Sequence, residues 1–250
     1  MKAVEVKDLN VFIGEAHVLK DVSFELDHPS VLVIVGPNGA GKTTLLKTIL
    51  GFIKRSSGII KVFNTDPEKD PGRIRNLVSY MPQIHNIDPF IPLKVREIVS
   101  TPVFFGESDP DLVDKALQIT GLEEYADRYF YELSGGLRQR VLVARALAKK
   151  ADLLIFDEPL SMVDIGSREH IIDLLMNIVR KESISMIVAS HDVSHCIKYD
   201  PYILLLNKTV IGFGKAREVF TLENLAKIYG AATLNGKIFF MGEEHGSSVR

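Results

Sequence analysis

Two kinds of hydrophobic pattern divide the chain. Alternating apolar and polar residues run through positions 3–11 and 18–26, which predicts two antiparallel strands with one face in solvent. Later in the chain, short continuous apolar runs predict parallel strands that are covered on both faces. These runs occupy residues 31–35, 153–156, 186–189 and 202–206. Helical stretches separate several of them, so the pattern predicts an α/β core preceded by an antiparallel β subdomain.

Residues 88–150 lack this strand pattern and predict helices at 94–104, 111–120 and 135–149. We expect a helical subdomain inserted into the core. The whole of residues 1–235 is expected to form one domain, and residues 236–250 a C-terminal strand and a frayed tail. Residues 54–58 are interpreted as a solvated turn.

Composition narrows the class of protein. The 250 residues are 46% hydrophobic and 25% charged, which is typical of a soluble globular protein. A net charge of -2 gives no overall field that would attract nucleic acid, so no nucleic-acid partner is expected. The single cysteine, Cys196, suits a reducing compartment such as the cytoplasm. No apolar run approaches the roughly 20 residues that span a bilayer, and the alternating start of the chain is expected to be a strand rather than a signal segment.

A phosphate-binding loop follows the predicted strand at 31–35. The sequence Gly-Pro-Asn-Gly-Ala-Gly-Lys-Thr occupies residues 36–43, directly before a predicted helix. Glycines let successive backbone N–H groups point at a phosphate, and the helix N-terminus adds partial positive charge. Lys42 supplies a full charge, and Thr43 supplies a hydroxyl oxygen of the kind that Mg2+ prefers. The loop therefore predicts nucleotide binding.

Two adjacent carboxylates follow the apolar run at 153–156. Strand alternation predicts that Asp157 and Glu158 point to different sides. One can hold Mg2+ while the other orients and deprotonates an attacking water. An ordinary acidic turn would give the same pattern, but the phosphate loop in the same core favours catalysis.

A third motif, Leu-Ser-Gly-Gly at 133–136, stands before an arginine-rich predicted helix with Ser134 as its natural N-cap. Such a helix start is a second anion site. One chain has little use for two such sites, unless the helix start of one molecule completes the phosphate loop of another.

With these motifs in this order, the chain resembles the ATP-binding cassette of ABC transporters from its first strands to about Gly230. The resemblance implies a P-loop NTPase core of the RecA-like type, with an N-terminal antiparallel β subdomain and an inserted α-helical subdomain. It also implies hydrolysis of MgATP by a head-to-tail dimer with two sites at the interface.

The resemblance implies a role for each motif residue. Glu158 would be the catalytic base, and His191 the switch histidine at the γ-phosphate. The Mg2+ contacts would come from Thr43, Gln83 and Asp157. The implied nucleotide-binding residues, including the D-loop residue Asp164, are Gly36, Pro37, Asn38, Gly39, Ala40, Gly41, Lys42, Thr43, Thr44, Gln83, Ser134, Gly135, Gly136, Asp157 and Asp164.

Two positions depart from the family pattern. Leu137 stands where the family has Gln after the signature glycines. Because the motif acts mainly through Ser134 and backbone N–H groups, we expect function to be retained and any deficit to lie in the rate. The aromatic residue that stacks on adenine aligns with Ile13, and Phe12 is one position away, which leaves open which of the two contacts the base.

The process that the ATPase drives is a separate question. The stretch between Lys42 and Ser134 is too short for the coiled-coil arms of chromosome and repair ATPases, and there is one cassette, so a separate membrane permease is the expected partner. The segments 91–99 and 210–225 are similar to the zinc and manganese uptake subfamily. We expect a cytoplasmic subunit at the inner face of the membrane, acting with a permease that receives solute from an extracytoplasmic solute-binding protein. The alternatives are the ATPase of an iron-chelate or vitamin importer, of an exporter, or a soluble assembly ATPase of the iron-sulfur type.

Overall fold

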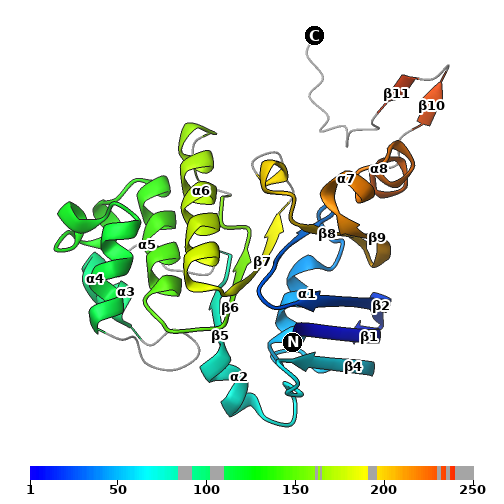
Figure 1. Cartoon of the computed structure of the whole chain (residues 1–250), viewed down its shortest axis with the longest axis horizontal. Coiled ribbons are helices and arrows are strands. Elements are labelled where there is room, and N and C mark those ends of the chain that lie inside the picture. Colours follow the sequence, from blue (N-terminus) through cyan, green and yellow to red (C-terminus); the bar gives the residue numbers. More distant parts are fainter. Residues whose placement is uncertain are drawn as a thin grey trace.

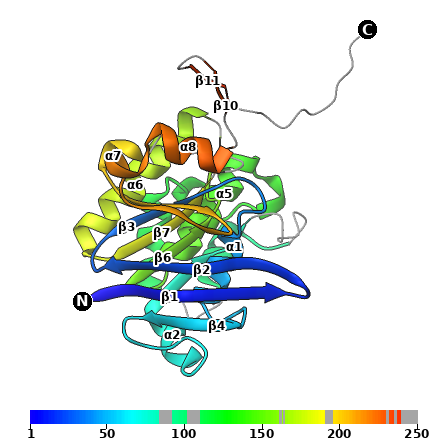
Figure 2. The ribbon, with the colours of Figure 1, turned by 90° about the vertical axis from the view of Figure 1, so that its right-hand side faces the viewer.

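A three-stranded antiparallel sheet forms the N-terminal part of the molecule. The structure, a computed structural model, describes residues 1–83, 92–101, 110–160, 163, 165–190, 196–229, 232–234 and 237–239. The sheet has the order β2-β1-β4, built from β1 (Lys2–Ile13), β2 (Ala16–Asp27) and β4 (Ser57–Val62) (Figure 2). Val4 and Val6 are buried on β1 while Lys7 is exposed, so much of the predicted alternation is confirmed.

A six-stranded sheet forms the core and has the order β5-β6-β7-β3-β8-β9. All its neighbouring pairs are parallel except β8 and β9, which are antiparallel. Its strands are β3 (Val31–Val35), β5 (Val78–Met81), β6 (Leu153–Asp157), β7 (Ser185–Ser190), β8 (Tyr202–Asn207) and β9 (Thr209–Lys215). The four continuous apolar runs of the sequence all lie in these strands, which confirms the predicted α/β core.

Side chains on alternate positions of β3 enter two different hydrophobic cores. Leu32 and Ile34 pack with the antiparallel sheet and with α1 (Lys42–Ile49). Val33 and Val35 pack on the other face, in the core to which α6 (Ile165–Glu182) contributes. A strand covered on both faces must be apolar throughout, which explains the continuous run.

The described residues form six further α-helices. They are α2 (Pro71–Leu77), α3 (Val95–Ser100), α4 (Pro110–Ile119), α5 (Gly135–Leu147), α7 (Ala216–Val219) and α8 (Leu222–Tyr229). Short 3-10 helices occupy Glu123–Tyr125, Phe130–Glu132 and Ile197–Tyr199. Figure 1 shows α3, α4 and α5 together at one side of the molecule, where they share a hydrophobic core of their own. The hairpin of β10 (Ala232–Leu234) and β11 (Lys237–Phe239) projects beyond α8 in Figures 1 and 2.

Two sequence predictions are wrong in detail. The first predicted helix ends at Ser100 rather than at 104, because Thr101 precedes a proline and takes an extended ψ of 138°. The interpretation of 54–58 as a solvated turn is wrong at Ser57, where β4 begins. Arg55 in this segment is not simply solvated either, because its guanidinium donates to both carboxylate oxygens of Asp66, at 3.2 and 2.7 Å. No helix in the described ranges is long and apolar enough to cross a membrane.

Candidate functional site

The phosphate-loop motif forms the turn between β3 and α1. Gly41 is the N-cap of α1 with φ +95°, a left-handed conformation that favours glycine. A Cβ on Gly36 would lie 2.1 Å from the carbonyl oxygen of Leu206, and one on Gly41 would lie 2.7 Å from Leu19 Cδ2. The backbone carbonyl of Leu206 excludes a side chain at Gly36, and the left-handed backbone favours glycine at Gly41.

The side chain of Lys42 turns back over this loop. Its Nζ donates hydrogen bonds to the carbonyl oxygens of Gly36 at 2.7 Å and Pro37 at 3.1 Å, and lies 3.8 Å from Glu158 Oε1. Burial lowers the pKa of Lys42, while the carboxylates of Glu158 and Asp157 offset part of that effect. Lys42 therefore places a cation between the phosphate loop and the end of β6.

Asp157, the last residue of β6, lies beside the start of α1. Thr43 Oγ1 donates a hydrogen bond to Asp157 Oδ1 at 3.2 Å. Burial raises the pKa of Asp157, and the hydrogen bond from Thr43 opposes the rise. Burial also raises the pKa of Tyr80 on the neighbouring strand β5, and the negative charge of Asp157 adds to this increase.

The hydroxyl oxygen of Thr43 and the carboxylate of Asp157 together fit a magnesium ion. The second oxygen of Asp157, Oδ2, is buried and accepts no hydrogen bond of ordinary geometry from the residues described. A buried carboxylate next to a hydroxyl oxygen is the hard-oxygen environment that Mg2+ prefers. Thr43 and Asp157 thus place oxygen atoms that could hold such a cation side by side.

Glu158 lies just past the end of β6 in a left-handed conformation, with φ +53°. Because β6 ends at Asp157, strand alternation alone does not fix the direction of the Glu158 side chain. The backbone N–H of Glu158 donates to the carbonyl oxygen of Ala189 on β7 at 2.9 Å. Asp157 thus lies beside Thr43, and Glu158 beside Lys42.

A cavity of about 420 Å³ opens over this arrangement. Its polar lining includes residues 38–44 of the phosphate loop, Gln83 and Glu158. Its apolar wall is made by Ile13, Ala16 and Val18, which come from the hairpin of β1 and β2. The sequence predicted the polar part, but the contribution of Ala16 and Val18 depends on how the hairpin folds over the loop.

The two candidates for the adenine contact, Ile13 and Phe12, lie differently relative to the cavity. Ile13 lines the cavity, whereas Phe12 is not among the lining residues. The ring of Phe12 instead stacks on that of His17, with centroids 4.1 Å apart and planes 11° apart. At this edge of the cavity the lining side chain is therefore aliphatic.

Ser134 caps α5 as predicted, and its Oγ accepts a hydrogen bond from Leu137 N at 3.4 Å. None of the described residues that line the cavity belongs to α5 or its cap. The structure thus groups the phosphate loop with Gln83, Asp157 and Glu158, and leaves Ser134, Gly135 and Gly136 outside this cavity. Asp164 and His191 lie outside the described residues.

A phosphate loop after a buried strand, with two carboxylates at the end of another strand of the same sheet, defines a P-loop nucleoside triphosphatase. The sequence profile of the ABC transporter family matches residues 19–161. The manganese transport system ATP-binding protein MntB of Halalkalibacterium halodurans is 37% identical over 234 residues, covering 90% of this chain and 91% of the relative. The zinc transport system ATP-binding protein TroB of Treponema pallidum is 34% identical over 236 residues, covering 91% and 87%.

Solved structures agree with this assignment. The cbiO1 protein of Clostridium perfringens, part of the ABC transporter complex cbiONQ, has 28% identity and a TM-score of 0.76, with 90% of this chain and 93% of that chain covered. The dimeric bacterial ABC transporter cassette MJ0796 has 26% identity and a TM-score of 0.73, with 85% and 98% covered. The chain belongs to the ABC transporter family and is an ATPase of that family.

Proposed function

We propose that this chain is the ATP-hydrolysing subunit of an importer for a divalent metal ion, manganese or zinc. The observation that carries this choice of solute is similarity over nearly the whole chain to the ATP-binding proteins of manganese and zinc transport systems, at 37% and 34% identity. In this proposal the chain works at the inner face of the cell membrane, bound to a permease that receives metal from an extracytoplasmic binding protein.

ATP would bind in the cavity above the phosphate loop. Its phosphates would accept hydrogen bonds from the backbone N–H groups of the loop and would make a charge-assisted contact with Lys42. The aliphatic wall of Ile13, Ala16 and Val18 would cover one face of the base. Nucleotide binding would thus replace the hydrogen bonds that Lys42 makes to the loop carbonyls with stronger ones to phosphate.

Thr43 and Asp157 would hold Mg2+, with Gln83 reaching it from the end of β5. When bound, Mg2+ neutralises charge on the β- and γ-phosphates. Burial raises the pKa of the Asp157 carboxyl, which means that its charged form lacks compensation. A bound cation would supply that compensation. Glu158 would accept the proton of the attacking water, and His191 would contact the γ-phosphate.

The signature motif would serve a second copy of the chain. Ser134, Gly135 and Gly136 start α5, where backbone N–H groups and the helix dipole favour an anion. Since these residues do not line the cavity of their own chain, we propose that they face the γ-phosphate held by the partner, with Asp164 near the contact. Two copies would then close head to tail over two ATP molecules, and hydrolysis would reopen them.

Uptake measurements test the proposed solute. Cells whose only copy of this chain is the Glu158→Gln variant are expected to lose accumulation of radioactive manganese or zinc, while cells with the parental chain keep it. Unchanged uptake of both metals would contradict metal import. Affinity purification of the tagged parental chain is expected to recover a membrane protein, whereas a soluble scaffold protein would instead favour an assembly ATPase.

A further inference from the structure

The buried side chain of Gln139 joins the signature helix to the turn that carries Glu158. Gln139 lies on α5, between one and two helical turns beyond Ser134, and none of its surface is exposed. Its Nε2 donates hydrogen bonds to the carbonyl oxygens of Pro159 at 2.5 Å and Glu158 at 3.4 Å. Both acceptors belong to the backbone of the catalytic turn in the same chain.

That turn needs support from its surroundings. A left-handed conformation is unfavourable for a non-glycine residue, and it persists where neighbouring contacts fix the backbone. Glu158, with φ +53°, is fixed on its N-terminal side by the hydrogen bond from its N–H to Ala189. Gln139 fixes the other side, because it binds the carbonyl of Glu158 and the next carbonyl along the chain.

We propose that Gln139 is a positioning residue for the catalytic base, acting within its own chain. It holds the turn so that the Glu158 carboxylate stays beside Lys42 and the cavity. It also connects the helix whose first turn serves the partner's ATP with the base that serves the chain's own ATP. The inference rests on the proposed roles of Glu158 and Ser134.

The substitution Gln139→Met tests the hydrogen bonds at nearly constant volume. Methionine keeps the length of the side chain and removes the donor, and the lost Oε1 has no hydrogen-bond partner among the described residues. A general base contributes about 100- to 10,000-fold to a rate, so loosening it is expected to lower kcat at least about tenfold. KM for ATP should stay within about twofold, because the phosphate loop is untouched. Gln118→Met, at an exposed position of α4, is the matched control and should keep the parental kcat.

A second readout separates positioning from support of the signature helix. If Gln139 positions the base, the double variant Gln139→Met/Glu158→Gln, which cannot turn over, should still form an ATP-dependent dimer, as the Glu158→Gln chain should. Loss of that dimer, or parental kcat in the Gln139→Met chain, would overturn the proposal. Gln139→Asn, whose amide is too short to reach the turn, should behave in the same way and replaces Gln139→Met if that variant does not fold.

Mixed dimers show in which subunit Gln139→Met lowers turnover. One subunit carries Glu158→Gln, so that only the site built on the other subunit's phosphate loop turns over. Gln139→Met in the subunit with the intact Glu158 should reduce turnover at least about tenfold, and in the Glu158→Gln subunit less than about twofold. A larger loss of turnover when Gln139→Met lies in the Glu158→Gln subunit would overturn the proposal. Full turnover by a dimer of two Glu158→Gln chains would instead refute the proposed function, whatever Gln139 does.

Discussion

The ammonium nitrogen of Lys42 lies 3.8 Å from Oε1 of Glu158, and 8% and 10% of these side chains are exposed. The phosphate loop and the catalytic turn thus meet through two opposite charges. The same cation donates to two carbonyl oxygens of the loop, at 2.7 and 3.1 Å. Nucleotide phosphates would enter a site whose positive charge is already directed over the loop.

Removing this cation should weaken nucleotide binding. Lys42→Met is expected to raise the Kd for ATP about 10- to 100-fold, since a hydrogen bond to a charged group contributes about 1.5–3 kcal/mol. Equilibrium binding of a fluorescent ATP analogue would measure the change. Lys54→Met, at an exposed position outside the cavity, is the control and should bind like the parent. Equal affinity of Lys42→Met and the parent would contradict the role given to Lys42.

The aliphatic wall predicts a gain of affinity on substitution by an aromatic residue. Ile13→Tyr is expected to lower the Kd for ATP about fivefold or more, because stacking of a base on an aromatic ring contributes about 1–3 kcal/mol. Binding of inorganic triphosphate, which has no base, should not change. A Kd for ATP that also stays unchanged would mean that the base does not lie against Ile13.

Leu137 should affect the rate rather than binding. The hydrogen bond to Ser134 Oγ comes from the backbone of Leu137, so the cap of α5 does not depend on this side chain. Leu137→Gln is expected to raise kcat less than about tenfold without changing the Kd for ATP. Since Leu137 is partly buried against the helical core, the variant should also lose about 1 kcal/mol of stability in a urea titration. A Kd for ATP that changes more than kcat would count against this account.

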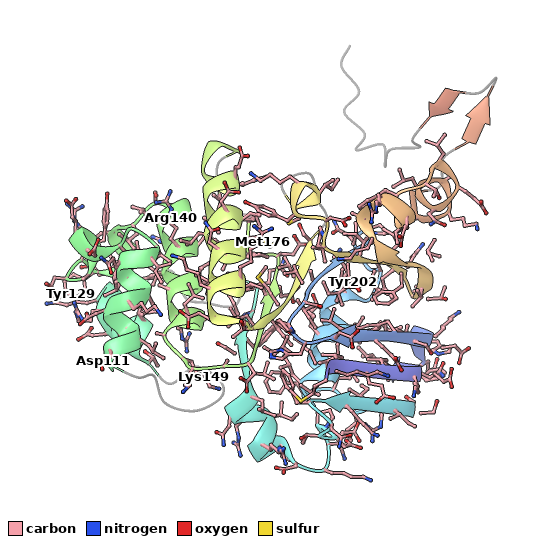
Figure 3. All side chains as sticks on the ribbon, in the orientation of Figure 1. Asp111, Tyr129, Arg140, Lys149, Met176 and Tyr202 are labelled. Atoms are coloured by element: carbon pink, nitrogen blue, oxygen red, sulfur yellow. The ribbon has the colours of Figure 1, made fainter. Side chains whose placement is uncertain are left out.

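Lys149 gives a prediction for pH. Its Nζ donates to the carbonyl oxygens of Arg75 and Val78 at the end of α2, with the Val78 contact at 3.0 Å. Figure 3 labels Lys149 beyond the lower end of α5, near α2. Burial lowers its pKa from 10.5 to about 8. Between these two values the unfolded chain holds a proton that the folded chain has released, so stability rises with pH across this window.

The free energy of unfolding tests this directly. The difference between the parent and Lys149→Met should move in favour of the parent as pH rises from about 8 to about 10.5. Urea unfolding at several pH values would measure it. Lys150→Met, at the exposed neighbouring position, should show no such trend relative to the parent. A difference that is constant with pH would mean that the pKa of Lys149 is not depressed.

The sequence predicted the elements that are determined by a local pattern of residues. The apolar runs at 31–35 and 153–156, the glycine pattern of the phosphate loop and Ser134 as an N-cap all depend on local chemistry, and the structure contains each of these features. Strand order and β4 were not predicted, because pairing between distant segments leaves little trace in either one. The positive φ of Glu158 was not predicted either, because contacts from Ala189 and Gln139, which are distant in the sequence, hold it.

The choice between Ile13 and Phe12 shows the same limit. Neighbouring residues on a strand face opposite sides, so either register was compatible with the sequence. In the structure Phe12 stacks on His17 across the hairpin, and Ile13 is the one of the two that lines the cavity. In the same way, Leu137 could be recognised as a departure from the family pattern, but its packing against the helical core required the structure.

The molar mass of the Glu158→Gln chain, measured in solution with and without MgATP, tests whether two copies share their nucleotide sites. The shared-site account predicts a monomer without nucleotide and a dimer with MgATP, because each Ser134 helix start would bind the γ-phosphate held by the other chain and the missing base would prevent reopening. A monomer in both conditions, with ATP binding confirmed, would contradict it.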